Sequence, residues 1–180
     1  MVLQMVGKDI LRKIAHIVFR VDKLKKSNIK EFAKNLRGKK ILELGSGKKE
    51  KGHYRYSVKK FFDSSNLFLQ SDINPNFGHK VIDAEKMNYK NEFDVILCLN
   101  VLEHTLNYEK VINNIYMALK PKGAAVFIVP VFYPLHDEPA DYWRFTEHSL
   151  RKLLSNFKKI SLNYSGLRQY PFAYFIKAIK

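Results

Sequence analysis

Apolar residues in the first part of the chain recur at the spacing of α-helices. One helix is predicted over residues 9–21. A second is predicted from near Asn28 to Leu36, because Asn28 and Glu31 have the spacing of a capping box and Gly38 ends the pattern. The first helix carries its apolar residues on one face: Ile10, Ile14, Ile17, Val18 and Val21. Such a stripe is buried against the protein core or in an anionic membrane surface, and we favour the core.

Short apolar segments of strand length follow and alternate with helix signals. The pattern predicts strands over 40–44, 67–71, 80–82, 93–99 and 124–131, and helices over 54–62 and 108–119. Strands that are apolar throughout are covered on both faces by helices. The sequence therefore predicts an α/β fold with a doubly wound, mostly parallel, Rossmann-like sheet.

The C-terminal part has a different pattern. Thr146 is placed to cap a helix over 147–155, and two strands are predicted over 159–164 and 172–179 with no helix between them. Adjacent strands joined by so short a connection pair antiparallel. We therefore expect a seven-stranded sheet that ends in a C-terminal antiparallel hairpin.

Length and composition fit one domain. A chain of 180 residues, 46% of them hydrophobic, buries a core without disulfide bonds or structural metal. We expect residues 1–37 to form a basic helical cover and residues 38–180 the core of the same domain. Cys98 is the only cysteine, which excludes a disulfide framework and a zinc site made of cysteines alone. Because no run approaches about 20 apolar residues and no cleavable signal pattern is present, we expect a cytoplasmic protein.

The positive charge of the chain, +15 overall, is concentrated in its first third. Residues 1–60 carry 18 Lys and Arg against 5 Asp and Glu. Only 7 of the 32 basic residues are Arg, the residue preferred for phosphate and base recognition. This composition favours a solvated or membrane-facing basic surface over a nucleic-acid interface.

Glycine or polar residues follow four of the predicted strands. Gly45-Ser46-Gly47 follows the first strand, Asp72 the second, Asp83 the third and Asn100 the fourth. The carboxyl ends of parallel strands meet at one rim of the sheet, where ligands of such folds bind. Glycines let the backbone approach a ligand, a helix N-terminus after them would attract an anionic group, and a carboxylate after the second strand can accept ribose hydroxyls.

Two common phosphate-binding motifs are excluded by the residues at their required positions. Glu50 occupies the third glycine position of the dinucleotide fingerprint, and Leu42 and Lys49 occupy required positions of the phosphate loop. The alternatives that remain are an ordinary tight turn at the glycines and an Asx turn between Asp72 and Asn74.

The sequence resembles the class I S-adenosylmethionine-dependent methyltransferases. The resemblance covers roughly residues 37–180 and rests on five segments in the order and approximate spacing of that family: ILELGSG (41–47), QSDINP (70–75), VIDAEKM (81–87), FDVILCLNVLEH (93–104) and LKPKGAAVFIVP (119–130). It implies S-adenosylmethionine as cofactor and methyl transfer as the reaction. The chain departs from the pattern at Lys49, where the family often has a third small residue.

The resemblance also implies roles for individual residues. The loop at Gly45 would pass along the methionine part of the cofactor, with Glu43 fixing the loop. Asp72 would take the ribose hydroxyls and Asp83 the adenine amino group, while backbone around Asn100 borders the methionine end. The cofactor-binding residues implied are Glu43, Gly45, Ser46, Gly47, Asp72, Ile73, Asp83, Ala84 and Asn100.

The segment over residues 133–146 is dense in aromatic, acidic and histidine side chains. It resembles the DYWRFT segment of small bacterial methyltransferases that are linked in part with surface-sugar and lipid pathways. We expect Tyr142, Trp143 and Arg144 to bind the acceptor. The alternative is that Trp143 and Phe145 pack the loop on the core and that Arg144 pairs with Asp141 or Glu138.

Two histidines are candidates for a catalytic base. His104 follows the fourth strand and His136 lies in the segment after the fifth, and imidazole titrates close to neutral pH. His136, Asp137 and Glu138 are adjacent ligand types, but neighbours in sequence seldom converge on one ion. We therefore predict no metal site.

The leading hypothesis is S-adenosylmethionine-dependent methyl transfer to a small-molecule acceptor or to a lipid- or sugar-linked intermediate, with the N-terminal helices covering the pocket. The alternatives are an RNA methyltransferase, for which the basic first third would be the footprint, and a non-catalytic methyltransferase-like binding protein. We expect at most weak, salt-reversible contact with anionic membranes. The sequence leaves the oligomeric state open.

Overall fold

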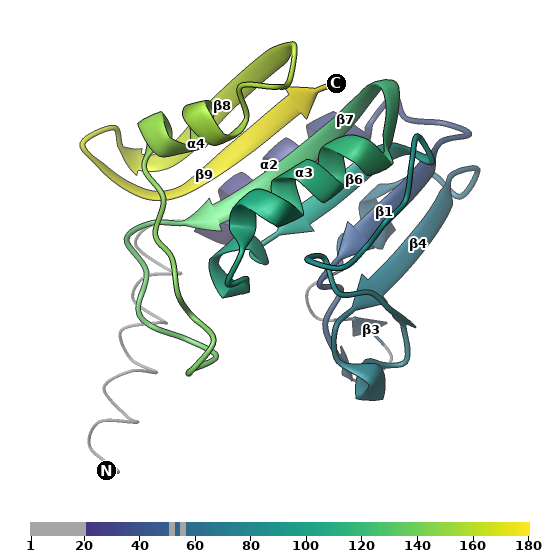
Figure 1. Cartoon of the computed structure of the whole chain (residues 1–180), viewed down its shortest axis with the longest axis horizontal. Coiled ribbons are helices and arrows are strands. Elements are labelled where there is room, and N and C mark those ends of the chain that lie inside the picture. The colour runs from purple at the N-terminus through teal and green to yellow at the C-terminus, as the bar shows by residue number, and fades with distance from the viewer. Residues whose placement is uncertain (1–20, 51–52, 55–56) are drawn as a thin grey trace.

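The computed structural model describes residues 21–50, 53–54 and 57–180. In that part of the chain, seven strands form one sheet in the order β5-β4-β1-β6-β7-β9-β8 (Figure 1). These strands are β1 (Lys40–Leu44), β4 (Leu67–Asp72), β5 (Lys80–Val81), β6 (Phe93–Leu99), β7 (Leu119–Pro130), β8 (Lys159–Leu167) and β9 (Tyr170–Ile179). The α-helices are α2 (Val21–Ala33), α3 (Tyr108–Ala118) and α4 (Glu147–Leu153), and the 3₁₀ turns are η1 (Lys59–Phe61), η2 (Pro75–Phe77) and η3 (Leu102–His104).

The pairing of the strands confirms the predicted fold class. β1 pairs parallel with β4 and β6, β5 pairs parallel with β4, and β7 pairs parallel with β6. β9 pairs antiparallel with both β7 and β8, so the antiparallel hairpin is confirmed. Within this hairpin, β9 lies inside the sheet and β8 lies at its edge. The burial explains this order, since β9 is largely buried, whereas β8 is mostly exposed or half-buried.

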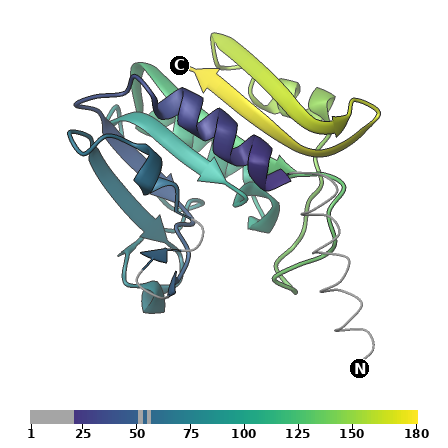
Figure 2. The same cartoon turned by 180° about the vertical axis from the view of Figure 1, so that it is seen from behind.

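Helices cover both faces of the sheet. Figure 1 shows α3 and α4 on one face, and Figure 2 shows α2 on the other. Successive strand residues point to opposite faces, so Ile41 packs with Ile29 of α2, whereas Leu42 belongs to the cluster with Ile115 of α3. Cys98 is fully buried on the α3 face, as expected for a small core residue.

Two helix predictions are wrong in detail. Asn28 lies inside α2, because the lysine-rich residues before it are good helix formers and extend the helix toward the N-terminus. The helix predicted over 54–62 is replaced by the 3₁₀ turn η1 and, before it, by a hairpin of β2 (Lys49–Glu50) and β3 (His53–Tyr54). The Val58 N–H donates to the Glu43 carboxylate, and this long-range bond takes the place of a helical one.

The Lys120–Gly123 segment, which separates the helix and the strand predicted over 108–119 and 124–131, lies within β7. It forms an irregularity in the pairing with β6, where the partners step from Phe93 and Leu119 to Val95 and Ala124. The strand therefore begins directly after α3.

The predicted helix over 9–21 lies outside the described residues except for Val21. Its neighbour α2 packs flat on the sheet, with Ile29 and Ala33 buried. The rest of the cover predicted from the N-terminal sequence lies outside the described residues. No helix among the described residues is long and apolar enough to cross a membrane.

Candidate active site

The glycine-rich loop lies where β1 ends. Gly45 and Gly47 have φ angles of 68° and 73°, which residues with a side chain rarely adopt. A Cβ atom on Gly45 would lie 2.5 Å from Cγ2 of Val101, so the loop packs directly against the segment after β6. The Ser46 N–H donates to the Ser71 carbonyl at 2.9 Å and ties the loop to β4.

Glu43 lies beneath this loop and is 1% exposed. Its carboxylate accepts hydrogen bonds from Ser46 Oγ at 2.7 Å, Ser57 Oγ at 2.6 Å and the Val58 N–H at 2.7 Å. A buried carboxylate requires such donors. Glu43 therefore holds the loop and the start of η1 together, whereas a direct contact with the cofactor stays a prediction.

Asp72 ends β4 and is 7% exposed. Its Oδ2 accepts the Gly47 N–H at 2.9 Å and its Oδ1 accepts the Asn74 N–H at 3.0 Å. His79, which the sequence analysis did not single out, places Nε2 2.8 Å from the Gly47 carbonyl. These bonds join the ends of β1 and β4. The Asx turn at Asp72 and its proposed contact with ribose are compatible, because each carboxylate oxygen has a second lone pair.

The remaining predicted cofactor residues follow three strands, β4, β5 and β6, whose ends lie at the same rim. Ile73 is 65% exposed beside Asp72. Asp83 follows β5, accepts the Glu85 N–H at 2.9 Å and pairs with Lys86 Nζ at 3.1 Å. Ala84 is buried, and Asn100, with a φ angle of 55°, follows β6. The structure thus brings the predicted cofactor residues to one rim, and their contacts with a ligand stay predictions.

The loop after Gly47 differs from the expectation. Instead of a helix whose N-terminus faces the ligand, Lys49 begins the hairpin β2–β3. Any anionic group at this rim would therefore rely on backbone N–H groups of the loop itself, without an adjoining helix dipole.

Asp141 organises the segment that follows β7. Its carboxylate accepts hydrogen bonds from Arg144 Nη1 at 2.6 Å and Nη2 at 2.8 Å, and from the His136 N–H at 3.0 Å. Burial alone would raise the pKa of Asp141, but these donors outweigh burial and lower the pKa to about 2. The same pairing raises the pKa of Arg144. Arg144 thus pairs with Asp141, the alternative considered from the sequence, and its contact with the acceptor stays a prediction.

The segment docks on η3 through its backbone. The N–H groups of Tyr142 and Trp143 lie 2.9 and 3.3 Å from the Glu103 carbonyl. Trp143 Nε1 donates to the Thr105 carbonyl at 2.8 Å, and the indole packs edge-to-face on Tyr108 with ring centroids 5.0 Å apart.

The two aromatic candidates differ in their surroundings. Trp143 lines a groove of about 530 Å³ that runs beside α3 and includes residues of α4. Phe145 is 5% exposed, which confirms that it packs on the core. Tyr142 is 43% exposed and remains the more accessible acceptor candidate.

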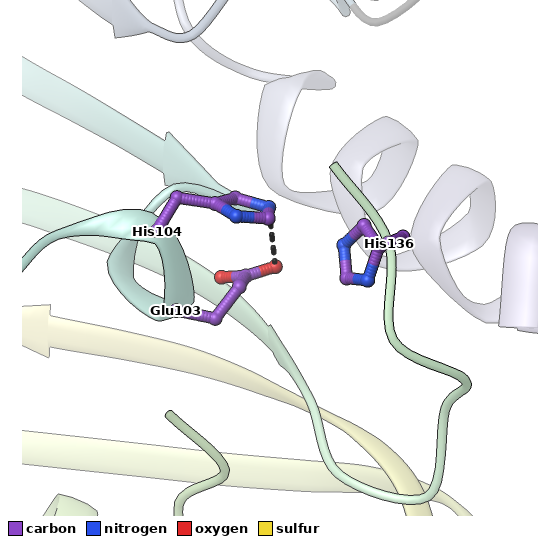
Figure 3. Close-up of side chains that lie close together, drawn as sticks. All are labelled: Glu103, His104 and His136. Atoms are coloured by element: carbon purple, nitrogen blue, oxygen red, sulfur yellow. Dashed lines mark ion pairs between the residues drawn. The ribbon is translucent and has the colours of Figure 1, made fainter. Parts of the chain in front are cut away.

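The structure brings the two candidate catalytic histidines together, although 31 residues separate them in the sequence. The rings of His104 and His136 lie edge-to-face with centroids 4.8 Å apart, and Figure 3 shows Glu103 beside them. Glu103 is fully buried, and its Oε1 lies 3.8 Å from His104 Nε2. Ligand atoms of all three side chains lie within 4.8 Å of one another.

The sequence analysis missed Glu103 and the convergence of these three residues. The adjacent ligand types His136, Asp137 and Glu138 do not form this cluster, since only His136 belongs to it. Glu103 directly precedes His104 in the segment after β6, so its position was a usable signal. Its full burial was not visible from the sequence.

Comparisons with known proteins are consistent with this architecture. A family model described as a methyltransferase domain matches residues 15–162, most of the chain. An uncharacterized protein of Methanocaldococcus jannaschii is 51% identical over 39 residues, which are 22% of this chain and 17% of that protein.

Among solved structures, Haemonchus contortus phosphoethanolamine N-methyltransferase 2, in complex with S-adenosyl-L-methionine, has a TM-score of 0.68. It is 16% identical and covers 88% of this chain and 52% of its own. A SAM-dependent methyltransferase from Archaeoglobus fulgidus has a TM-score of 0.63 at 16% identity and covers 93% of this chain and 98% of its own. At such identities the structural likeness shows the fold alone.

Proposed function

We propose that this chain, which belongs to the methyltransferase domain family, is an S-adenosylmethionine-dependent methyltransferase. Its acceptor is a small molecule or a lipid- or sugar-linked intermediate with an apolar part. The acceptor would bind beside the cofactor, between η3 and the segment after β7. The observation that carries this proposal is the exposure of apolar residues close in sequence to the two histidines.

The strand ends fit S-adenosylmethionine in their donor and acceptor chemistry. The cofactor has no phosphate, so its ribose and amino groups call for carboxylates and its one carboxylate for backbone N–H groups. Asp72 is almost fully buried at the rim, and each of its oxygens accepts one backbone N–H group and has a second lone pair. Ile73, 65% exposed, offers an apolar surface beside it for the adenine ring.

On this basis we assign the cofactor contacts as follows. Asp72 accepts hydrogen bonds from the ribose hydroxyls, and Asp83 accepts one from the adenine amino group. Ile73 and Ala84 border the adenine ring. Backbone at Gly45, Ser46, Gly47 and Asn100 borders the methionine part, while Glu43 acts indirectly by holding the loop.

When bound, S-adenosylmethionine supplies a methyl group on a positively charged sulfur atom. The contribution of the chain is mainly to position the acceptor in line with that methyl group. Proximity and orientation of this kind contribute on the order of 7–11 kcal/mol in well-oriented reactions. The hydrogen bonds that dock Tyr142 and Trp143 on Glu103 hold the acceptor side at a fixed distance from the rim.

Exposed apolar side chains flank the histidines on both segments. Leu106 follows η3 and is 66% exposed, and Phe132 and Leu135 precede His136 and are 65% and 58% exposed. Large exposed apolar side chains that flank a site on more than one segment are suited to contact with an apolar ligand. They favour an acceptor with an apolar part over a purely polar metabolite or a nucleic acid.

The experiment combines a binding test with a labelling test. Isothermal titration calorimetry with S-adenosylmethionine should give one site on the full chain. Incubation with methyl-labelled S-adenosylmethionine and, separately, a chloroform-soluble extract, an aqueous metabolite extract and total RNA should then transfer label mainly to a chloroform-soluble product.

Each other outcome has a definite meaning. Label found only in RNA would contradict the acceptor class and favour the alternative suggested by the basic first third. A folded protein that binds S-adenosylmethionine but labels none of the fractions would contradict this acceptor. If the folded protein does not bind S-adenosylmethionine, the result would favour the non-catalytic alternative.

A further inference from the structure

Glu103, His104 and His136 form a cluster of metal-ligand types on the acceptor side of the rim. Glu103 and His104 are consecutive residues of η3, and His136 comes from the segment after β7. One ligand atom from each side chain lies within 4.8 Å of the others. In Figure 3, a ring nitrogen of His136 points toward His104 and Glu103.

Both imidazoles use Nδ1 for bonds to the protein. His104 Nδ1 lies 2.5 Å from the Ala140 carbonyl. His136 Nδ1 lies 3.2 Å from the Pro134 carbonyl and 3.1 Å from Asp141 Oδ2. Because these partners only accept hydrogen bonds, Nδ1 carries the proton on both rings, and Nε2 is left as the atom for a ligand. A carbonyl or carboxylate on the second nitrogen is the usual support of a metal-binding histidine.

We propose that Glu103, His104 and His136 bind one divalent transition-metal ion, for which Zn²⁺ is the best match to two imidazoles and one carboxylate. Three protein ligands of this kind leave a further coordination position open, as in zinc sites that bind a water molecule or a substrate. This part of the inference rests on the proposed function: the open position would take an oxygen atom of the acceptor. Hydroxylated acceptors are therefore the favoured class.

The distances fit an ion between the side chains better than a direct contact. At 3.8 Å, His104 Nε2 and Glu103 Oε1 are too far apart for a hydrogen bond. Ligand atoms about 2.1 Å from a tetrahedral ion lie about 3.4 Å from each other. A closure of about 1.4 Å by side-chain rotation would therefore bring the observed 4.8 Å spread to the distance expected between ligands of one ion.

Burial and charge also suit a cation. Glu103 is fully buried, and a buried carboxylate is strongly stabilised by a neighbouring positive charge. The side chains of His104 and His136 are 21% and 8% exposed, which gives an ion access from solvent.

The test measures metal binding by the full chain without any acceptor. Metal-free protein, prepared with a chelator, is titrated with Zn²⁺ in competition with a chromophoric chelator, and with Co²⁺ while visible absorption is recorded. We expect one ion per chain and the strong visible absorption typical of Co²⁺ in a tetrahedral site. His136→Ala and Glu103→Gln should each weaken Zn²⁺ binding by more than about 100-fold, since even supporting residues are worth 10- to 100-fold.

His148→Ala is the matched control, because His148 lies on α4 and outside the cluster. It should bind Zn²⁺ as the unmodified protein does. The fold of each variant is checked by circular dichroism and by S-adenosylmethionine binding, which the cluster variants should retain. Zn²⁺ affinity that is unchanged in both folded cluster variants, or no binding at micromolar Zn²⁺, would overturn the proposal. A failure of the proposed function would instead appear as an unmodified protein that does not bind S-adenosylmethionine.

Discussion

Asp72 holds two backbone N–H groups and, in our proposal, also the ribose of the cofactor. Glu43 shows the other arrangement. Its buried carboxylate accepts three hydrogen bonds from the protein, and its role in holding the loop requires no contact with a ligand. At the scale of single residues, the two acids at neighbouring strand ends are thus distinguished by which donors surround them. Residue type and spacing did not separate a supporting acid from a binding one.

Replacing Asp72 with Ala should abolish measurable S-adenosylmethionine binding. The substitution should also lower the free energy of unfolding by about 1–3 kcal/mol, because the N–H groups of Gly47 and Asn74 lose their acceptor. The position of Asp72 at the end of a strand did not by itself predict this loss of stability. Calorimetry with the cofactor and urea denaturation measure the two effects. Glu31→Ala is the control and should change neither by much, because the Glu31 side chain is 78% exposed on α2. Unchanged cofactor affinity in a folded Asp72→Ala protein would remove the ribose assignment.

Cys98 should not react with thiol reagents in the folded protein. It is fully buried in β6, and burial, assisted by the negative charge of Glu103, raises the pKa of its thiol. Because it is the only cysteine, the mass increase after iodoacetamide treatment reports its modification directly. Labelling should require unfolding by urea. Rapid stoichiometric labelling without denaturant would show that the α3 face of the sheet opens readily.

The two ends of the strands have separate tasks. At the carboxyl ends, β1, β4, β5 and β6 lead into the residues proposed to bind the cofactor. At the opposite end, Asp94 in β6 accepts hydrogen bonds from the Lys40 N–H and from Lys120 Nζ, each at 2.8 Å, and so joins β1 and β7 to β6. Variants at this end should change stability without touching the site.

Asp94→Asn should lower the free energy of unfolding by about 1–2 kcal/mol at neutral pH, because two hydrogen bonds to a charged acceptor are weakened. Burial alone would raise the pKa of Asp94, but the Lys120 and Lys40 donors outweigh it and lower the pKa below 3.8. The depressed pKa stabilises the fold above pH 3.8, and this contribution is lost as the pH falls through the folded-state pKa.

Urea denaturation of both proteins at neutral pH and below pH 3.8 measures this dependence. The difference in stability should shrink in acid. Glu92→Gln is the control, since its ion pair with Lys40 is more exposed and is worth less than about 1 kcal/mol. A difference that stays constant with pH would contradict the role of the Asp94 charge.

Across the whole molecule, two apolar clusters hold one sheet from opposite sides. The cluster on the α2 side includes Ile29, Ile41 and Val126, and residues of α3 and α4 close the other side. The basic first third therefore contributes to the core through α2, which carries four of its 18 basic residues.

Removing residues 1–36 should expose the α2 side of the sheet and give an aggregated or cofactor-free protein. A milder change, Ile29→Ala, should cost about 2–5 kcal/mol, because Ile29 is completely buried. Size-exclusion chromatography and denaturation measure the two effects, with Lys26→Ala, at an exposed position of α2, as the control. A monomeric truncation with full cofactor affinity would contradict the structural task of α2.

The sequence by itself determined the class of the fold, the order of the strands along the chain and the rim where the chemistry lies. β1 and β6 were predicted with their observed bounds, because an apolar strand flanked by glycine or polar residues leaves little choice of register. The residues after each parallel strand had to meet at one rim, since parallel strands share a direction.

Only the tertiary structure decided which side chains meet. The insertion of β9 between β7 and β8, the hairpin β2–β3 in place of a helix, and the contact of Asp72 with Gly47 depend on partners far away in the sequence. The cluster of Glu103, His104 and His136 depends on the docking of residues 142–143 on η3. Local propensity and spacing describe neighbours along the chain, whereas these arrangements are set by burial and hydrogen bonding between segments that only folding brings together.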